Sequence, residues 1–320
     1  MNAREILQDT GVLPRLDHSE LRTHSAVKSV PLLRSFSEHG MVLLQGFPDE
    51  AAFMEFTDTY GRSFSDYLGG GMRWGALDRQ AIGGNPTLLS VTGATQGFGM
   101  ALHGEMYYLG TRPSILWFYC DTPPAEGGET TVCDGEALFE ALTPATRRYL
   151  EENRTTYRRS LSREEWETAY QTSDLDQVRR ICATHGTAVR ERPDGGIETE
   201  FACSPLVRTA RGKTAFVNSL LLIDSVERAF ESGWVRDHLD GARRPDSPIV
   251  VRLESGERVD PGVIAEAAET AEALTRDVRW SRGDVLMVDN TRVMHGRRPA
   301  PDPARRIYVR MAEPAFAGAS

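Results

Sequence analysis

The sequence predicts a mainly β protein, a β sandwich with helices inserted between its strands. Short apolar runs of strand length recur along the chain, separated by polar turns that contain glycine or proline. Helical patterns lie between them without the regular alternation of a doubly wound α/β sheet, which is the alternative architecture. No repeat, low-complexity tract or Gly/Ser/Pro linker divides the 320 residues. We therefore expect a single domain over residues 1–320, with a helical insertion at about residues 134–186.

The first third of the chain mixes helices with short strands. Residues 30–39 carry apolar side chains at helical spacing, and this pattern stops at Gly40. Residues 41–44 form an apolar run that predicts a buried strand, and a second helix is expected over residues 48–60. Residues 87–91 predict the next strand.

Strand patterns dominate the remainder of the chain, interrupted by helical ones. Residues 114–120 and 130–134 are apolar runs flanked by Pro and Gly. Asp134 is a suitable N-cap for the first helix that follows. The expected helices cover residues 135–142, 163–170, 175–184 and 261–274, and the expected later strands cover residues 197–201, 214–223, 249–253, 285–288 and 307–311.

Composition and charge restrict the possible partners. The chain has 37 Lys and Arg against 46 Asp and Glu, a net charge of −9, which disfavours nucleic acid and anionic lipid. Its longest apolar stretches are strand-sized, whereas a membrane span needs about 20 apolar residues. Four cysteines without a CxxC pair, and an N-terminus without an apolar signal core, lead us to expect reduced thiols and a cytoplasmic location. We therefore expect no nucleic acid and no membrane as partner.

Two of the seven histidines stand in surroundings that suggest chemistry, and His103 is the first. On an extended segment, residues i and i+2 point to the same face, so His103 and Glu105 can converge on one point. An imidazole and a carboxylate supply two of the three ligands of a 2-His-1-carboxylate site for non-haem Fe(II). The polar face of a partly exposed strand is the other explanation of this short pattern.

His295 is the second of these histidines. The strand expected at residues 285–288 runs into a polar turn, and His295 follows within a few residues. In a β sandwich this order places the imidazole near the mouth of the fold, where it can supply a third ligand. Its long separation from His103 is compatible with an antiparallel sandwich, because neighbouring strands there need not be neighbours in sequence.

A basic strand follows near the C-terminus. Arg306, Tyr308 and Arg310 share one face of it, while Ile307 and Val309 take the other. Two guanidinium groups that point into a barrel are costly unless anions meet them. Since the guanidinium fork matches a carboxylate in bidentate fashion, we expect this face to hold organic acids. An edge strand with a solvated basic face is the alternative.

Together these residues resemble a known enzyme family, the Fe(II)/2-oxoglutarate-dependent dioxygenases of the taurine dioxygenase and clavaminate synthase type. The family pattern combines a proximal HxD or HxE, a distal histidine after a G-D-(apolar)-D-N stretch, an arginine shortly beyond it, and a Gly-Gly-Glu-Thr segment. The matching residues here are His103 and Glu105, Gly283-Asp284 with Asp289-Asn290, His295, Arg306, and Gly127-Gly128-Glu129-Thr130. The resemblance spans about residues 30–315.

The resemblance implies a fold, a set of cofactors and a role for each matching residue. The fold is a double-stranded β-helix (jelly roll), and the cofactors are Fe(II), the co-substrate 2-oxoglutarate and O₂. The implied roles are Fe(II) ligands for His103, Glu105 and His295, binding of the distal 2-oxoglutarate carboxylate for Thr130 and Arg306, and substrate binding for Arg310.

Glu105 narrows the reaction that the resemblance implies. A glutamate at this position is similar to the subset that hydroxylates amino acids, including the syringomycin-type aspartate hydroxylases. A carboxylate there argues against the related halogenases, which have a small residue in its place. We therefore expect hydroxylation of an unactivated C–H bond, at the β-carbon, of a small-molecule amino-acid-like substrate in specialised metabolism. The substrate would be a free amino acid, a small peptide, or an amino acid presented by a carrier protein.

Three other functions are compatible with the sequence. The same cofactors support desaturation, epoxidation or cyclisation. A product lighter by two hydrogen atoms distinguishes desaturation or cyclisation from hydroxylation, which adds one oxygen atom. A sandwich-fold binding module without enzymatic activity would hold no metal. A zinc hydrolase could use the same three ligands, but it would leave the two arginines without a task.

Overall fold

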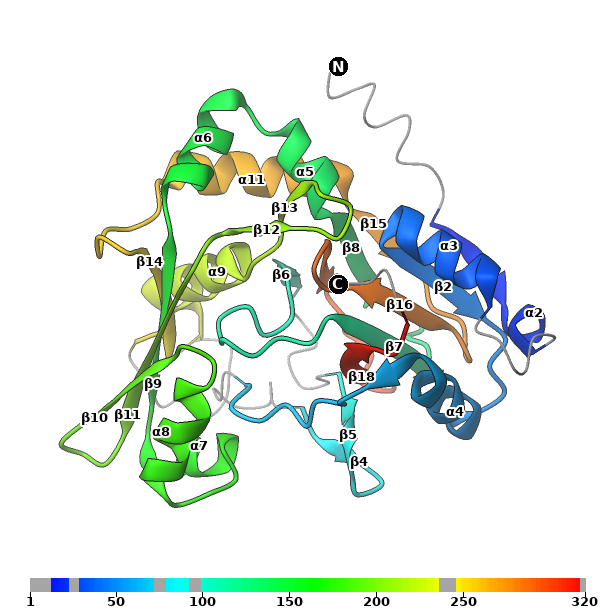
Figure 1. Cartoon of the computed structure of the whole chain (residues 1–320), viewed down its shortest axis with the longest axis horizontal. Helices are drawn as coiled ribbons and strands as arrows, with labels where there is room; N and C mark the ends of the chain where they lie inside the picture. The colour runs from blue at the N-terminus through cyan, green and yellow to red at the C-terminus, as the bar shows by residue number, and fades with distance from the viewer. Residues whose placement is uncertain (1–12, 23–28, 72–78, 92–98, 236–245, 317–320) are drawn as a thin grey trace.

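The computed structural model describes residues 13–22, 29–71, 79–91, 99–235 and 246–316 (Figure 1). Two β-sheets pack face to face around an apolar core, and helices, a third sheet and the two-stranded sheet β12-β13 surround them. This is the helix-decorated β sandwich that the sequence predicts. The N-terminal residues used in predicting the cellular location lie outside the described residues.

The larger sheet has the strand order β1-β2-β16-β7-β18-β5-β4, and β3 pairs with β18. Within the described chain β1 runs parallel to β2, and the other pairs of this sheet are antiparallel. Its strands are β1 (Arg15–Asp17), β2 (Met41–Gln45), β3 (Gly61–Arg62), β4 (Ala81–Ile82), β5 (Asn85–Ser90), β7 (Ile115–Thr122), β16 (Val285–Asp289) and β18 (Arg306–Pro314).

The smaller sheet has the order β15-β8-β17-β6 and is antiparallel. Its strands are β6 (Met100–His103), β8 (Thr130–Asp134), β15 (Arg276–Val278) and β17 (Val293–Arg297). Alternate side chains of the two sheets meet in the core between them. Leu116 and Phe118 of β7 pack there with Val132 of β8 and Val293 of β17. The core therefore lies directly beside the strands that carry the two histidines.

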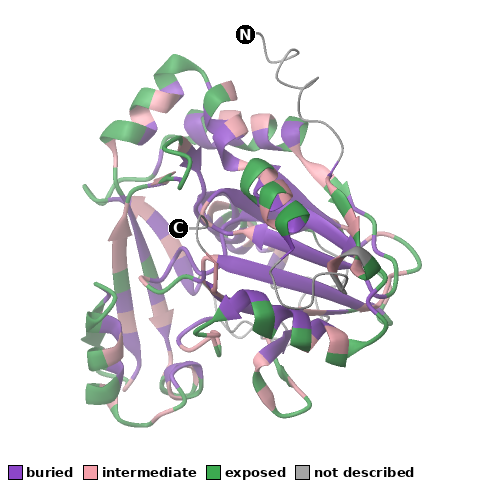
Figure 2. Cartoon of the chain, turned by 45° about the vertical axis from the view of Figure 1, so that its right-hand side comes forward, coloured by how far each residue is buried: buried purple, intermediate pink, exposed green. Residues whose placement is uncertain are grey.

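Helices α3 (Val30–His39) and α4 (Glu50–Tyr60) cover the opposite face of the larger sheet. Helix α3 begins at Ser29, whose hydroxyl accepts the Leu32 N–H, and ends at Gly40 in the left-handed conformation with φ 70°. The central strands are thus buried on both faces, as Figure 2 shows. This explains why they read as continuous apolar runs instead of alternating ones.

A third sheet, β10-β11-β9-β14, lies on the far side of the molecule from α3 and α4 (Figure 1). Helix α9 packs against both β14 of this sheet and β6 of the smaller sheet, which links it to the strand that carries His103. The strands outside the sandwich are β9 (Thr155–Leu161), β10 (Ala188–Glu191), β11 (Ile197–Cys203), β12 (Leu206–Arg208), β13 (Thr214–Phe216) and β14 (Ile249–Leu253). The remaining helices are α2 (His18–Arg22), α5 (Gly135–Ala141), α6 (Pro144–Glu152), α7 (Arg163–Ala169), α8 (Leu175–Ala183), α9 (Leu220–Glu231) and α11 (Pro261–Leu274).

Two stretches differ from the sequence prediction. The single strand expected over residues 214–223 is wrong, because β13 ends at Phe216 and α9 begins at Leu220. The apolar run at residues 220–223 is the first turn of an amphipathic helix whose buried face continues through Val226 and Phe230. A short apolar run by itself does not distinguish a strand from a buried helix segment. The region expected to be a helical insertion, residues 134–186, also contains strand β9.

The structure also bears on two predictions from composition. Among the described residues, no helix combines the length and the apolar character that crossing a membrane requires. The four cysteines are free thiols, as predicted. Burial raises the pKa of the Cys120 thiol to about 12, so this group stays protonated at neutral pH.

Candidate metal and co-substrate site

The side chains of His103, Glu105 and His295 lie together beside the core of the sandwich. His103 ends strand β6, Glu105 lies in the turn that follows, and His295 lies on β17. The register of this strand pair sets His295 opposite His103, with ring centroids 4.4 Å apart. One possible ligand atom from each residue lies within 4.8 Å of the other two, and all three residues are buried. The sequence predicted the convergence of the three side chains, although Glu105 reaches the group from a turn and not from an extended strand.

This group fits a divalent transition-metal ion. Two imidazoles and one carboxylate form the ligand set of non-haem iron sites that keep open positions. His295 Nε2 and Glu105 Oε2 are 3.4 Å apart, near the separation of about 3 Å expected for two ligands each about 2.1 Å from one ion. His295 Nδ1 is buried and has no hydrogen-bond partner in the described chain. The ring can therefore carry its proton on Nδ1, which leaves the lone pair of Nε2 for an ion.

His103 is held in the form that binds a metal. Its Nδ1–H donates to the carbonyl of Ala101 at 2.9 Å, because a carbonyl can only accept. This tautomer leaves Nε2 with a free lone pair. Burial, followed by the proximity of His295, lowers the pKa of His103 to about 3. The ring is therefore neutral at physiological pH.

Glu105 carries the negative charge of the group. Burial alone would raise the pKa of this carboxyl. The guanidinium of Arg79, which is ion-paired with Oε2, and the hydrogen bond from His295 outweigh burial and hold the pKa well below its usual range. The carboxylate is thus ionised. The sequence reasoning did not identify Arg79, because no motif connects it with the ligands.

Asn290 and Gly104 fix the turn that presents Glu105. The Asn290 side-chain oxygen accepts the Glu105 N–H at 2.8 Å, and its amide donates to the carbonyls of Glu105 at 3.1 Å and Pro113 at 2.7 Å. A Cβ at Gly104 would overlap the Tyr107 ring, so no larger residue fits between the two ligands. The sequence pointed to Asp289-Asn290 as a motif without a role, and the structure shows that Asn290 clamps the backbone of a candidate ligand.

A second charged site, formed by Arg297 and Arg305, lies further along the interior. Arg297 is two residues beyond His295, so it shares the inward face of β17, and it pairs with Thr130 of β8. Arg305 Nε donates to the Gly128 carbonyl at 3.1 Å, while its Nη2 is buried without a hydrogen-bond partner among the described residues. Burial and the charge of Arg297 lower the pKa of Arg305 to about 10. Two buried like charges of this kind favour the binding of an anion.

The structure does not place Arg306 and Arg310 where the sequence predicted. The two do share a face of β18, but the aliphatic residues between them point into the core, so this face is the outer one. Arg306 is exposed and pairs with Asp121 at 2.6 Å. Arg310 is buried against helix α4, where it bonds Asp58 at 2.7 Å and lies over the Phe64 ring. Apolar side chains fill this part of the interior because an unpaired guanidinium there is costly. Of Arg305, Arg306 and Arg310, it is Arg305, one residue before the strand, that points inward.

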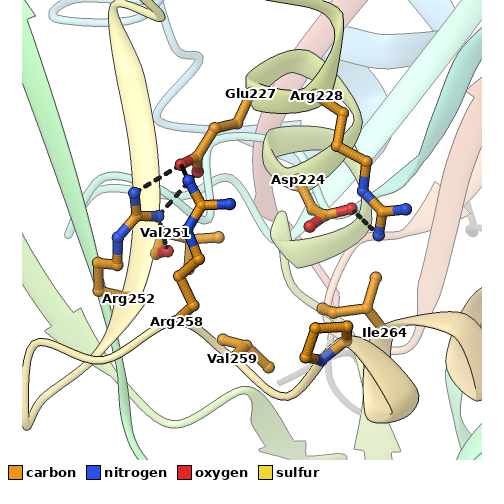
Figure 3. A pocket seen from close by; sticks show the side chains of 9 residues that line it. Asp224, Glu227, Arg228, Val251, Arg252, Arg258, Val259 and Ile264 are labelled. Carbon is orange, nitrogen blue, oxygen red and sulfur yellow. Dashed lines mark hydrogen bonds and ion pairs between the residues drawn. The ribbon is translucent and has the colours of Figure 1, made fainter. Parts of the chain in front are cut away.

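A pocket between α9 and β14 lies apart from this site (Figure 3). Its carboxylates are balanced by arginines that also line it. Asp224 pairs with Arg228 at 2.6 Å, and Glu227 pairs with Arg252 at 2.5 Å and with Arg258 at 3.3 Å. Because neither the three candidate ligands nor the Arg297–Arg305 pair lines this pocket, we assign it no catalytic role.

Known proteins match this chain over most of its length. The family model described as "Taurine catabolism dioxygenase TauD, TfdA family" matches residues 10–312. A clavaminate synthase-like protein of Arabidopsis thaliana is 26% identical over 292 residues, which cover 86% of this chain and 82% of that protein. The dapdiamide synthesis protein DdaC of Enterobacter agglomerans is 23% identical over 225 residues, which cover 69% of this chain and 67% of that protein.

Solved structures show the same fold. A putative alpha-ketoglutarate-dependent taurine dioxygenase from Burkholderia xenovorans matches with a TM-score of 0.54 at 12% identity, covering 96% of this chain and 91% of that one. The PvcB protein of Pseudomonas aeruginosa matches with a TM-score of 0.52 at 15% identity, covering 95% and 87%. The two facing sheets are thus the double-stranded β-helix that the sequence resemblance implied. The match to the family model covers nearly the whole chain. It therefore excludes two of the alternative functions considered from the sequence, the binding module and the zinc hydrolase. The protein belongs to the TauD/TfdA family and is an Fe(II)- and 2-oxoglutarate-dependent dioxygenase.

Proposed function

We propose that this dioxygenase hydroxylates an unactivated C–H bond, at the β-carbon, of an amino-acid-like small molecule in specialised metabolism. The observation that carries the proposal is the buried group of His103, Glu105 and His295 together with a separate pair of buried arginines. The three candidate ligands suit a ferrous ion, and the arginine pair suits a carboxylate. A keto acid with a distal carboxylate needs both.

The three candidate ligands would hold the metal. With 2-oxoglutarate and O₂, a bound ferrous ion supplies an oxidant that can attack an unactivated C–H bond. The neutral ring of His103 and the ionised carboxylate of Glu105 are already in the protonation states that coordination requires. A set of three protein ligands also leaves open positions for the co-substrates.

The arginine pair would bind the distal carboxylate of 2-oxoglutarate, with Arg305 in the role that the resemblance implied for Arg306. Arg305 Nη2 offers a donor that no described residue uses, and Arg297 adds a second guanidinium. Thr130 would assist, because its oxygen accepts the Trp280 indole N–H at 3.2 Å and leaves the hydroxyl proton free to donate. Charge-assisted contacts of this kind are about twice as strong as neutral ones.

The packing around the candidate ligands would keep water away from the reaction. Phe118 lies against the His295 ring with centroids 5.1 Å apart, and the apolar core continues through Val132 and Val293. Charged contacts in such a dry environment are stronger than in water. Unproductive side reactions with water would also be reduced.

Two observations support an amino-acid-like substrate. Glu105 resembles the glutamate of the amino-acid-hydroxylating subset, and a relative of this chain is a dapdiamide synthesis protein, which supports a role in biosynthesis. Desaturation or cyclisation would use the same residues as hydroxylation but would give a different product.

The test is turnover in the presence of Fe(II), ascorbate, 2-oxoglutarate and a panel of amino acids, offered as free acids and as thioesters. The expected result is succinate release with at least one panel member and a product heavier by one oxygen atom. A product lighter by two hydrogen atoms would replace hydroxylation with desaturation or cyclisation.

The matched controls are histidine variants. His103→Ala and His295→Ala should lose the metal, whereas His185→Ala, at an exposed position after α8, should retain it. A wild-type protein that binds neither metal nor 2-oxoglutarate would refute the proposal.

A further inference from the structure

Arg79 is a largely buried cation whose hydrogen-bonding capacity is only partly used. Its Nη2 donates to Glu105 Oε2, and its Cζ lies 5.1 Å from the centre of the Tyr67 ring. The other terminal nitrogen, Nη1, is buried and has no hydrogen-bond partner among the described residues. The side chain is 10% exposed. A buried donor without an acceptor is unfavourable, so this position favours the arrival of a further acceptor.

Arg79 also lines a pocket, and its ion pair with Glu105 connects this pocket with the candidate metal ligands. The other lining residues are Asp66, Tyr67, Gly70, Gly71, Leu89, Thr168, Ala169 and Gln171. One wall is firmly held, because Arg159 donates to the carbonyls of Gly69 at 2.7 Å and Gly71 at 2.8 Å. The Gly71 N–H in turn donates to the Tyr108 hydroxyl at 3.1 Å. Arg159 is itself buried, so it adds positive charge behind this wall.

The charge around Arg79 is balanced only while Glu105 is free of metal. Among the described residues, Glu105 is the carboxylate that forms an ion pair with Arg79. With a divalent ion at the three candidate ligands, Glu105 would share its charge with that ion, and a buried guanidinium would be left next to a cation. Such an arrangement is strongly unfavourable without another anion. Of the two carboxylates of 2-oxoglutarate, the distal one would be bound by Arg297 and Arg305 and the other by the metal, which leaves the unused Nη1 of Arg79 for a further carboxylate.

We propose that Arg79 anchors a free carboxylate of the organic substrate in the pocket beside Tyr67, and so directs the substrate toward the metal. This inference rests on the function proposed above and deepens it. It selects a free amino acid, or another small carboxylic acid, over a substrate tethered to a carrier through that carboxyl group. The guanidinium fork suits the task because it can contact both oxygens of a carboxylate.

The experiment measures binding without turnover. Wild-type protein, Arg79→Gln, Arg79→Lys and the control Arg62→Gln, at an exposed position on β3, are loaded with Mn(II) and N-oxalylglycine, an unreactive analogue of 2-oxoglutarate. Calorimetry then compares each L-amino acid with its carboxamide. The wild-type protein and Arg62→Gln should favour the best acid over its amide by about 10- to 100-fold, the effect of a hydrogen bond to a charged group.

Arg79→Gln should lose this preference for the acid while it binds Mn(II) and N-oxalylglycine at least as tightly, because Arg79 competes with the ion for Glu105 Oε2. Arg79→Lys keeps the charge but not the fork, and should retain part of the preference. A preference unchanged in Arg79→Gln would overturn the inference, as would a wild-type protein that favours no acid over its amide. Weaker Mn(II) binding in Arg79→Gln that Arg79→Lys restores would also overturn it, because Arg79 would then only position Glu105. Failure of the wild-type protein to bind Mn(II) or N-oxalylglycine would instead refute the proposed function itself.

Discussion

Replacing Arg305 by glutamine should weaken 2-oxoglutarate binding, whereas the same change at the adjacent Arg306 should not. Arg305 is 8% exposed and has a buried terminal nitrogen without a hydrogen-bond partner among the described residues. The Arg306 side chain is 60% exposed and is paired with Asp121 on the outer face of β18. Because the two variants remove the same charge one residue apart, each is a control for the other.

The expected magnitude follows from the surroundings of each side chain. A hydrogen bond to a charged group contributes about 1.5–3 kcal/mol, and about 1.4 kcal/mol corresponds to a tenfold change in affinity. Arg305→Gln should therefore raise the Kd for 2-oxoglutarate by about 10- to 150-fold. The exposed Arg306–Asp121 pair lies on the outer face of β18, away from the co-substrate, so Arg306→Gln should leave this Kd unchanged.

Thermal stability provides a second readout, in which Arg305→Gln should show no loss although its affinity for 2-oxoglutarate falls. Without co-substrate, Arg305→Gln removes one of two buried like charges, so its Tm should equal or exceed that of the wild-type protein. Calorimetric titration of 2-oxoglutarate into Mn(II)-loaded protein, together with thermal unfolding, measures both effects. Weaker binding in Arg306→Gln with normal binding in Arg305→Gln would show that the assignment from the structure is mistaken.

Three further predictions concern the candidate metal group. Asn290→Ala removes the clamp on the Glu105 backbone and should lower Mn(II) affinity by about 10- to 100-fold in calorimetry, as loss of other outer partners does; unchanged affinity would contradict this role. Gly104→Ala forces a methyl group against Tyr107 and should destabilise the fold by about 1–3 kcal/mol in denaturant unfolding, whereas a neutral effect would mean that the turn relaxes. In metal-free protein, lowering the pH from 6.5 to 4.5 should reduce the free energy of unfolding, by up to about 1.4 kcal/mol per pH unit. The reason is that His103 takes up a proton only when unfolded, since its folded pKa is about 3. His103→Gln should flatten this slope, and the lowered pKa of Glu105 adds a slope of the same sign only at more acidic pH.

Much of the fold could be predicted because local patterns agree with it. The helix over Val30–His39 and its end at Gly40 follow from apolar spacing and a left-handed glycine cap. Central strands such as β7 and β16 stand out because burial on both faces makes them continuously apolar. Helix α9 was missed for the same reason, since its first turn, residues 220–223, is also continuously apolar.

Part of the candidate site could not be predicted, because it depends on contacts between distant segments. The Arg79–Glu105 pair and the Asn290 clamp join parts of the chain that no short pattern connects. For Arg306 and Arg310, alternation correctly predicted a shared face but not which face it is. A shift of one residue along a strand moves a side chain to the opposite face of the sheet.

The sequence by itself determined the chemical type of the site, since two imidazoles, a carboxylate and nearby arginines restrict the chemistry wherever they meet. It also determined the β-rich architecture, because the periodicity of apolar residues reflects burial in a sheet. Only the tertiary structure decided that Arg305 and not Arg306 points inward, and that Arg79 balances the charge of Glu105. Those outcomes depend on which surface each strand or loop buries, and burial is a property of the assembled molecule.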